Sequence, residues 1–105
     1  MNIIQGDTNI ISVTIEGHDY DENDIVRFGL ASDRNGQAII EKTMSYDSQS
    51  GEYSVELTPT ETAQLTADER YWFDIGLQTS DGKFYRVIPI TEIWITPGIT
   101  EVSTE

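Results

Sequence analysis

The sequence predicts an all-β protein built as an antiparallel β-sandwich of two sheets. The first indication is the strict alternation of residues 71–78, in which large apolar side chains alternate with a tryptophan, a carboxylate, a glycine and an amide. Successive side chains of a strand point to opposite faces, so this pattern predicts one buried face. The second indication is the turn dipeptide Asp81-Gly82, which leads into the apolar residues 84–88 and favours a hairpin. The third is the presence of about seven short apolar runs with a turn signal every 8–12 residues or so. A small barrel is the alternative.

Four further strands are expected before this hairpin, three of them from an alternating apolar pattern. They cover residues 11–16, 26–31, 38–44 and 53–57. Polar segments rich in turn-forming residues separate them, at residues 17–24, 33–36 and 46–51. In the second of these segments, Asn35-Gly36 supplies residues that tolerate a positive φ.

After residue 57, the spacing of the apolar residues changes from the two-residue period of a strand to that of a helix. Thr58 can cap a helix, Pro59 suits the first helical position and Glu61 can complete a capping box. We therefore expect one short helical turn near residues 59–65, too short to be stable alone. Leu65 is expected to close the open end of the sandwich.

Two prolines indicate how the last predicted strand begins and ends. Pro89 is expected to interrupt the hydrogen-bond ladder, because it has no N–H to donate. Residues 90–95 are then predicted to form a further strand, offset by a kink or bulge and ended by Pro97-Gly98. We expect a single domain at residues 1–98 and a flexible tail at residues 99–105.

The composition excludes several functional classes. The chain has 19 acidic and 6 basic residues and a net charge of −13, so its surface repels phosphate groups and anionic membranes. It has no cysteine, which excludes disulfides and cysteine-based zinc or redox sites. The first residues lack the pattern of a signal peptide, and no apolar run reaches the roughly 20 residues that cross a bilayer. We expect a protein made in the cytoplasm that binds neither nucleic acid nor membrane.

One loop resembles the start of a calcium-binding loop. Asp19, Asp21 and Asn23 have the right spacing, but Asp24 and Leu30 stand where such a loop needs a glycine and a bidentate glutamate. We expect a solvated loop here, with a weak surface cation site as the alternative.

Catalytic chemistry is not expected. His18 is the only histidine, which gives no zinc constellation, and no nucleophile motif accompanies it. Pairs of carboxylates arise by chance among 19 acidic residues and are not specific for glycosidic chemistry. The sequence therefore predicts no enzyme and no cofactor.

Two tryptophans and one carboxylate are the candidate binding residues. Trp72 and Asp74 lie on the polar side of the alternating run at residues 71–78. An exposed tryptophan on a sheet often marks a contact surface, and it can also stack on a sugar ring. Cover by a neighbouring loop or strand is the alternative for Trp72. The face on which Trp94 lies depends on how Pro89 shifts the register.

The order of these elements resembles a known family. The resemblance extends over residues 4–97 and is carried by Ile4-Gln5-Gly6-Asp7-Thr8, Val26-Arg27-Phe28, Asp33-Arg34-Asn35-Gly36, Leu57-Thr58-Pro59-Thr60-Glu61-Thr62, Arg70-Tyr71-Trp72-Phe73-Asp74-Ile75, Asp81-Gly82 and Ile95-Thr96-Pro97. This series resembles the small immunoglobulin-like β-sandwich domains of tailed bacteriophages and prophages, notably the N-terminal domain of upper baseplate proteins.

The resemblance implies an immunoglobulin-like fold and a non-enzymatic role in the virion. Such a protein would contact other tail, baseplate or head proteins, or further copies of itself, through sheet edges and loops. The resemblance implies no catalytic residue and no cofactor. A carbohydrate-binding β-sandwich module that uses an exposed Trp72 is the alternative function.

Overall fold

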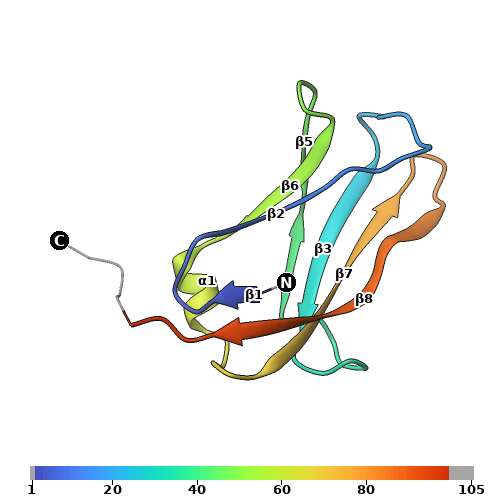
Figure 1. The fold of residues 1–105 in the computed structure, drawn as a ribbon. Helices are drawn as coiled ribbons and strands as arrows, with labels where there is room; N and C mark the ends of the chain where they lie inside the picture. The colour runs from blue at the N-terminus through green and yellow to red at the C-terminus, as the bar shows by residue number, and fades with distance from the viewer. Residues whose placement is uncertain (1, 100–105) are drawn as a thin grey trace.

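The computed structural model describes residues 2–99, which form two β-sheets and one short helix around a shared core (Figure 1). Within this segment there are eight strands, against the seven or so predicted, and one helix. The mostly β architecture with a short helix is confirmed. The predicted tail at residues 99–105 lies, apart from Ile99, outside the described residues.

One sheet has five strands and is mixed rather than fully antiparallel. In spatial order its strands are β1 (Asn2–Ile4), β8 (Phe84–Thr96), β7 (Arg70–Gln78), β3 (Ile25–Ala31) and β4 (Ile40–Thr43). All neighbours are antiparallel except β1, which runs parallel to β8. The prediction of purely antiparallel pairing is wrong at this edge, because a strand of three residues is too short to show an alternating pattern.

The second sheet has three antiparallel strands. In spatial order they are β2 (Asn9–Val13), β6 (Glu52–Leu57) and β5 (Ser45–Asp47). Strand β5 occupies the start of the segment predicted as a turn at 46–51, so that boundary is wrong. Its short polar sequence gave no strand signal, and pairing with β6 determines its conformation.

At both edges of the two sheets, the chain crosses directly from one sheet to the other. Strands β4 and β5 are separated by the single residue Met44, whose side chain is buried and whose N–H donates to the Val26 carbonyl (2.7 Å). On the other side, residues 5–8 connect β1 to β2. The edge strands are therefore only three to five residues long, which limits edge-to-edge pairing with other chains.

The register of β3 against β7 determines which side chains form the core. Val26 lies opposite Leu77, and Phe28 lies opposite Ile75. All four side chains are buried, as the alternating pattern predicts. The intervening residues of both strands consequently point to the opposite face of the five-stranded sheet.

Strand β8 continues through the proline that was expected to interrupt it. Phe73 is paired with Thr91 and Ile75 with Ile88, so Asp74 alone faces both Pro89 and Ile90. This arrangement is a β-bulge, which removes the need for an N–H at the proline position. The predicted offset is confirmed, but residues 84–96 form one strand rather than two.

The helix α1 (Pro59–Ala63) begins with the predicted capping box. The Thr58 N–H donates to Glu61 Oε1 (2.8 Å), and the Glu61 N–H donates to Thr58 Oγ1 (3.2 Å). Lys42 Nζ, from β4, lies 2.9 Å from the same Glu61 oxygen. Leu65, just beyond the helix, is buried as predicted. These contacts connect the helix to the five-stranded sheet.

We expect Glu61→Gln to lower stability at pH 7 and to have little effect in acid. The Thr58 backbone N–H, and then Lys42, hold the pKa of Glu61 below its ordinary value of 4.5. Because the pKa of Glu61 is lower in the folded state, the ionised carboxylate contributes its full stabilisation above pH 4.5. This contribution is lost as the pH falls through the folded pKa. Urea unfolding at pH 7 and at about pH 3 measures the difference between the wild type and the variant. A difference that persists unchanged in acid would contradict this account; Glu56→Gln, at an exposed carboxylate, is the control.

Candidate functional site

The outer face of the five-stranded sheet carries the predicted binding residues. Because Tyr71 and Phe73 are buried, the alternating residues Trp72 and Asp74 point away from the core. Trp94 lies between the buried Ile93 and Ile95 and therefore points to the same face. We call this surface, formed by the outward residues of β1, β8, β7, β3 and β4, the outer face.

Arg70 and Trp94 form a cross-strand pair on the outer face. They are directly paired between β7 and β8. The guanidinium carbon of Arg70 lies 5.1 Å from the centroid of the Trp94 ring, and Arg70 Nη1 lies 3.4 Å from Glu92 Oε2. The tryptophan is 43% exposed. This cation–π contact holds a large aromatic ring that stays accessible to solvent.

A second group of the same kind lies further along the two strands. The Phe84 ring covers Gly76, where an added Cβ would lie 2.4 Å from Phe84 Cζ. The Arg86 guanidinium carbon lies 4.4 Å from the Phe84 ring centroid, and Arg86 Nε donates to Asp74 Oδ2 (2.9 Å). The predicted binding residue Asp74 is thus already paired with an arginine.

The side chain of Trp72 is half-buried. It lies opposite Ala31 on one side and Glu92 on the other. A hollow of about 110 Å³ lies beside it, and its lining includes residues of the 33–36 turn, Asp74 and Ile90. Trp72 and the 33–36 turn therefore line the same hollow.

The sequence reasoning missed Arg70, Phe84 and Arg86 on this face. The signal that could have found them is Gly76, a small residue in the middle of an otherwise bulky strand. Such a glycine in a sheet often has an aromatic ring from the next strand packed over it. Identifying that ring requires the register of β7 and β8, which the bulge at Pro89 hides from the sequence.

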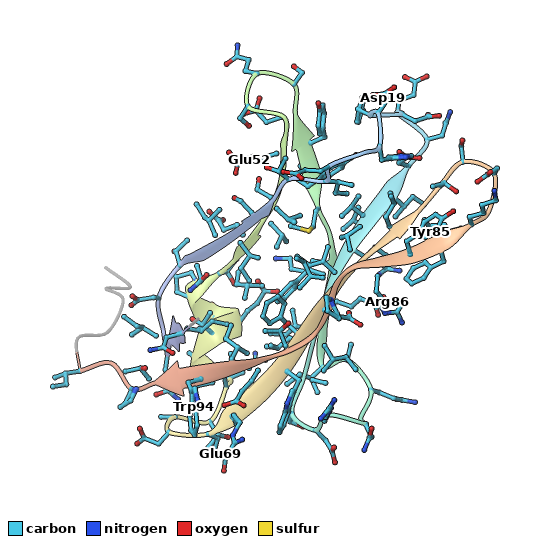
Figure 2. The ribbon with its side chains drawn as sticks, turned by 45° about the vertical axis from the view of Figure 1, so that its right-hand side comes forward. Asp19, Glu52, Glu69, Tyr85, Arg86 and Trp94 are labelled. Carbon is cyan, nitrogen blue, oxygen red and sulfur yellow. The ribbon has the colours of Figure 1, made fainter. Side chains whose placement is uncertain are left out.

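A cleft of about 760 Å³ lies at one end of the molecule. It is formed by the β2–β3 loop and by the β7–β8 hairpin, which lie side by side in Figure 1. Ser80 Oγ of the hairpin lies 3.3 Å from Asp21 Oδ2 of the loop, in position to donate a hydrogen bond. Figure 2 shows Asp19 and Tyr85 at this end, far from Trp94.

Part of the loop that we expect to be solvated, with a weak cation site as the alternative, lines this cleft. Asp19 and Asp21 are among the lining residues, whereas Asn23 donates its backbone N–H to Asp21 Oδ1 (2.8 Å) and lies outside the lining. Within residues 2–99, no three His, Asp or Glu side chains are grouped so as to hold a metal ion. The weak cation candidate of Asp19, Asp21 and Asn23, two carboxylates and one amide, stays a prediction.

His18 anchors the loop instead of serving as a ligand. Its Nε2 lies 2.6 Å from Asp24 Oδ2, and the Asp24 side chain is only 1% exposed. Across the sheets, Tyr20 of the loop stacks on Tyr46 with ring centroids 4.0 Å apart and an interplanar angle of 9°. The His18–Asp24 contact joins two residues of the β2–β3 loop itself, and the Tyr20–Tyr46 stack holds that loop against β5 of the three-stranded sheet.

A buried hydroxyl lies close to this cleft. Tyr53 is 5% exposed, and its Oη has no hydrogen-bond partner among residues 2–99. The side chain lines a cavity of about 50 Å³ that shares Ile15, His18 and Tyr20 with the cleft. Burial, and then the negative charge of Asp24, raise the pKa of Tyr53 above its ordinary value of 10.0. The hydroxyl is therefore neutral at physiological pH.

We expect the two tryptophans to differ in their contribution to stability. Trp72→Ala should lower the free energy of unfolding by about 2 kcal/mol, because a half-buried ring leaves an unfilled space. Trp94→Ala should cost less, about 1 kcal/mol, because its side chain is more exposed than that of Trp72. Urea denaturation measures both values, and equal losses would contradict the placement of the two rings.

Tyr53→Phe is expected to protect the protein at alkaline pH. Because the pKa of Tyr53 is raised in the folded state, the folded state holds this proton more tightly than the unfolded state does. The contribution of Tyr53 to stability is therefore complete below about pH 10. It is lost as the pH rises through the folded pKa, since the unfolded state releases its proton first. Tyr53→Phe has no hydroxyl proton to release, so it does not lose stability in this way at alkaline pH. At neutral pH it should be as stable as the wild type or more stable, because an unpaired buried hydroxyl costs about 1–3 kcal/mol. Urea unfolding from about pH 8 to 11 tests this; Tyr85→Phe is the exposed control, and a Tyr53→Phe profile identical to that of the wild type would refute it.

Comparison with known proteins adds no family to this geometry. No protein-family model matches the chain, and no curated protein sequence matches it. Within residues 2–99, no helix has the length and apolar character that spanning a membrane requires. The functional interpretation therefore rests on the outer face, on the cleft and on the motifs quoted above.

Proposed function

We propose that this chain is a non-enzymatic protein–protein interaction module of a tailed-phage or prophage particle, with an immunoglobulin-like β-sandwich fold. The observation that carries the proposal is the outer face, which no second layer of residues 2–99 covers. Large apolar side chains lie exposed along it. They are Ile4, Ile25, Phe84, Ile90 and Trp94, each 42% to 53% exposed.

The chemistry of the outer face is that of an interaction surface. Aromatic residues and arginine are the residue types enriched in protein interfaces. Three of the six basic residues of this acidic chain gather here, each against a carboxylate. These pairs are Arg27 with Glu41, Arg70 with Glu92 and Arg86 with Asp74. An aromatic and arginine-rich surface on a protein of net charge −13 offers a partner both apolar area and fixed polar contacts.

The short edges favour this face over edge pairing as the contact region. The resemblance implied docking through sheet edges and loops, but strand addition requires an exposed edge of some length. Here the edge strands β1 and β5 have three residues each. We therefore assign the contact to the outer face and to the loops around it.

Two features support the immunoglobulin-like description. The last two strands, β7 and β8, lie beside β3 in one sheet, and β2 and β6 lie together in the other. Near the start of β7, Tyr71 Oη accepts a hydrogen bond from the Thr66 N–H (2.8 Å). A tyrosine that binds upstream backbone at the start of the penultimate strand is the tyrosine corner of immunoglobulin-like domains.

A carbohydrate-binding module remains the second candidate. The observation in its favour is the hollow beside Trp72, which brings the carboxylates of Asp33 and Asp74 next to an aromatic ring. Its volume of about 110 Å³ is below the roughly 300–1,000 Å³ of most small-molecule sites. The outer face is the larger and better supported surface.

Particle association tests the proposal. Particles are purified on a density gradient from the bacterium that encodes the chain, and the chain is sought in them by mass spectrometry. We expect the wild-type chain to be incorporated and the double variant Phe84→Ala, Trp94→Ala to be excluded, because it loses two exposed rings at little cost in stability. Ile10→Ala, at a residue 65% exposed on the three-stranded sheet, is the matched control and should be incorporated.

Two results would contradict the proposal. One is the absence of the wild-type chain from purified particles. The other is saturable glycan binding by the isolated chain that is lost in Trp72→Ala and unaffected by Phe84→Ala, which would support the carbohydrate-binding module instead.

A further inference from the structure

The charged side chains of the outer face balance one another. Among the outward residues of its five strands, three arginines stand beside three carboxylates, and each arginine contacts one of them. The net charge of −13 is therefore carried by the rest of the chain. A strongly basic partner is attracted to that acidic remainder, whereas the outer face suits a partner surface that is itself balanced in charge.

Two exposed aromatic rings of β8 lie at matching positions on either side of the middle of β7. Trp94 is paired with Arg70 and Phe84 with Gln78, and these two β7 residues are each four positions from Asp74. At about 3.3 Å per residue, each ring lies roughly 13 Å along the sheet from the level of Asp74. A half-turn that reverses the strand direction about Asp74 therefore exchanges the positions of the two rings.

The charged neighbours of these rings follow the same symmetry with opposite sign. Glu92 is paired with Trp72 and Arg86 with Gly76, each two β7 positions from Asp74. The same half-turn therefore exchanges a carboxylate with a guanidinium group. When two copies of the sheet meet face to face in this orientation, an aromatic ring lies over an aromatic ring, and Glu92 of each copy lies over Arg86 of the other. The outer face is complementary to itself, as the interface of a twofold-symmetric dimer must be.

Both charged groups have bonding capacity for a second copy. Arg86 donates to Asp74 from Nε (2.9 Å), and its two Nη groups can donate to a further carboxylate. Glu92 contacts Arg70 Nη1 through Oε2 (3.4 Å), and its Oε1 can accept from a further donor. The side chains of Arg86 and Glu92 are 53% and 42% exposed. A pair between two chains can therefore form without breaking the pairs within each chain.

We infer that the partner of the outer face is a second copy of this chain, bound face to face with its strands antiparallel to those of the first. The inference rests on the proposed function, because it names the partner of the surface identified there. The twofold axis runs across the strands, so β7 lies over β7 and β8 over β8. Near the axis, each Asp74 keeps its contact with Arg86, and the exposed Ile90 adds apolar area.

The size and shape of the face suit such a dimer. The nine residues of β7 extend over about 30 Å and the five strands over about 20 Å, so the projected area is up to roughly 600 Å². Because side chains project from the sheet, their accessible area is larger than this. A stable interface buries about 800 Å² on each partner. Two twisted sheets also pack face to face with their strands within about 30° of alignment.

Sedimentation equilibrium of the purified chain at physiological salt, up to several hundred micromolar, tests the inference. We expect a monomer–dimer equilibrium. Glu92→Arg and Arg86→Glu should each raise the dissociation constant at least about tenfold, because each variant places like charges against one another at both ends of the contact. Glu56→Arg makes the same charge change as Glu92→Arg on the exposed side of the three-stranded sheet and should leave the dissociation constant nearly unchanged.

An equimolar mixture of Glu92→Arg and Arg86→Glu separates this arrangement from a general effect of charge. In the mixed dimer, the arginine introduced at position 92 of one chain faces the glutamate introduced at position 86 of the other. At the second contact, the native Arg86 and Glu92 meet. Both contacts again join opposite charges, so the mixture should dimerise about tenfold more tightly than either variant alone.

Three results would overturn the inference. They are a wild-type chain that stays monomeric at the highest concentration, single charge reversals that dimerise as tightly as the wild type, and a mixture that associates no more tightly than its components. Its failure is distinguishable from that of the proposed function. A monomeric chain found in purified particles would refute the second copy as partner and retain the virion role, whereas a dimeric chain absent from particles would refute the virion role alone.

Discussion

The pairing of β3 with β7 is the constraint on which the rest of the structure depends. Val26 opposite Leu77, Phe28 opposite Ile75 and Leu30 opposite Phe73 place six large side chains in the core. Because side chains alternate, the same register sends Trp72 and Asp74 to the outer face. A slip of one residue would expose the core and bury the outward polar groups. The outer face is thus a direct consequence of how the core is paired.

The structure gathers several arginines on one surface and several carboxylates on another, although these residues are mixed along the sequence. The basic residues are scattered along the sequence, yet Arg27, Arg70 and Arg86 lie on one face of one sheet. The carboxylates of the β2–β3 loop and of the hairpin meet instead in the cleft. Two surfaces of different chemistry follow, one aromatic and rich in arginine, the other acidic.

Sequence reasoning succeeded where the local pattern was strong. Alternation identified β3, β6 and β7, and the signals at Thr58, Pro59 and Glu61 predicted the capping box that the structure contains. It failed where pairing partners decide the conformation, as in β1 and β5, which have three residues each and no pattern of their own. The candidate site divides in the same way. Trp72 was found from its phase in the strand, whereas the cleft and the buried Tyr53 hydroxyl depend on contacts between segments distant in sequence.

Cross-strand nuclear Overhauser effects test the central constraint most directly. The register places Phe28 opposite Ile75 and Ala31 opposite Trp72, so contacts between the backbone protons of these pairs are expected across β3 and β7. Hα–Hα or HN–HN contacts shifted by one residue, with Phe28 against Asp74 in place of Phe28 against Ile75, would contradict the account. In that case Trp72 and Asp74 would face the core, and the outer face described above would not exist.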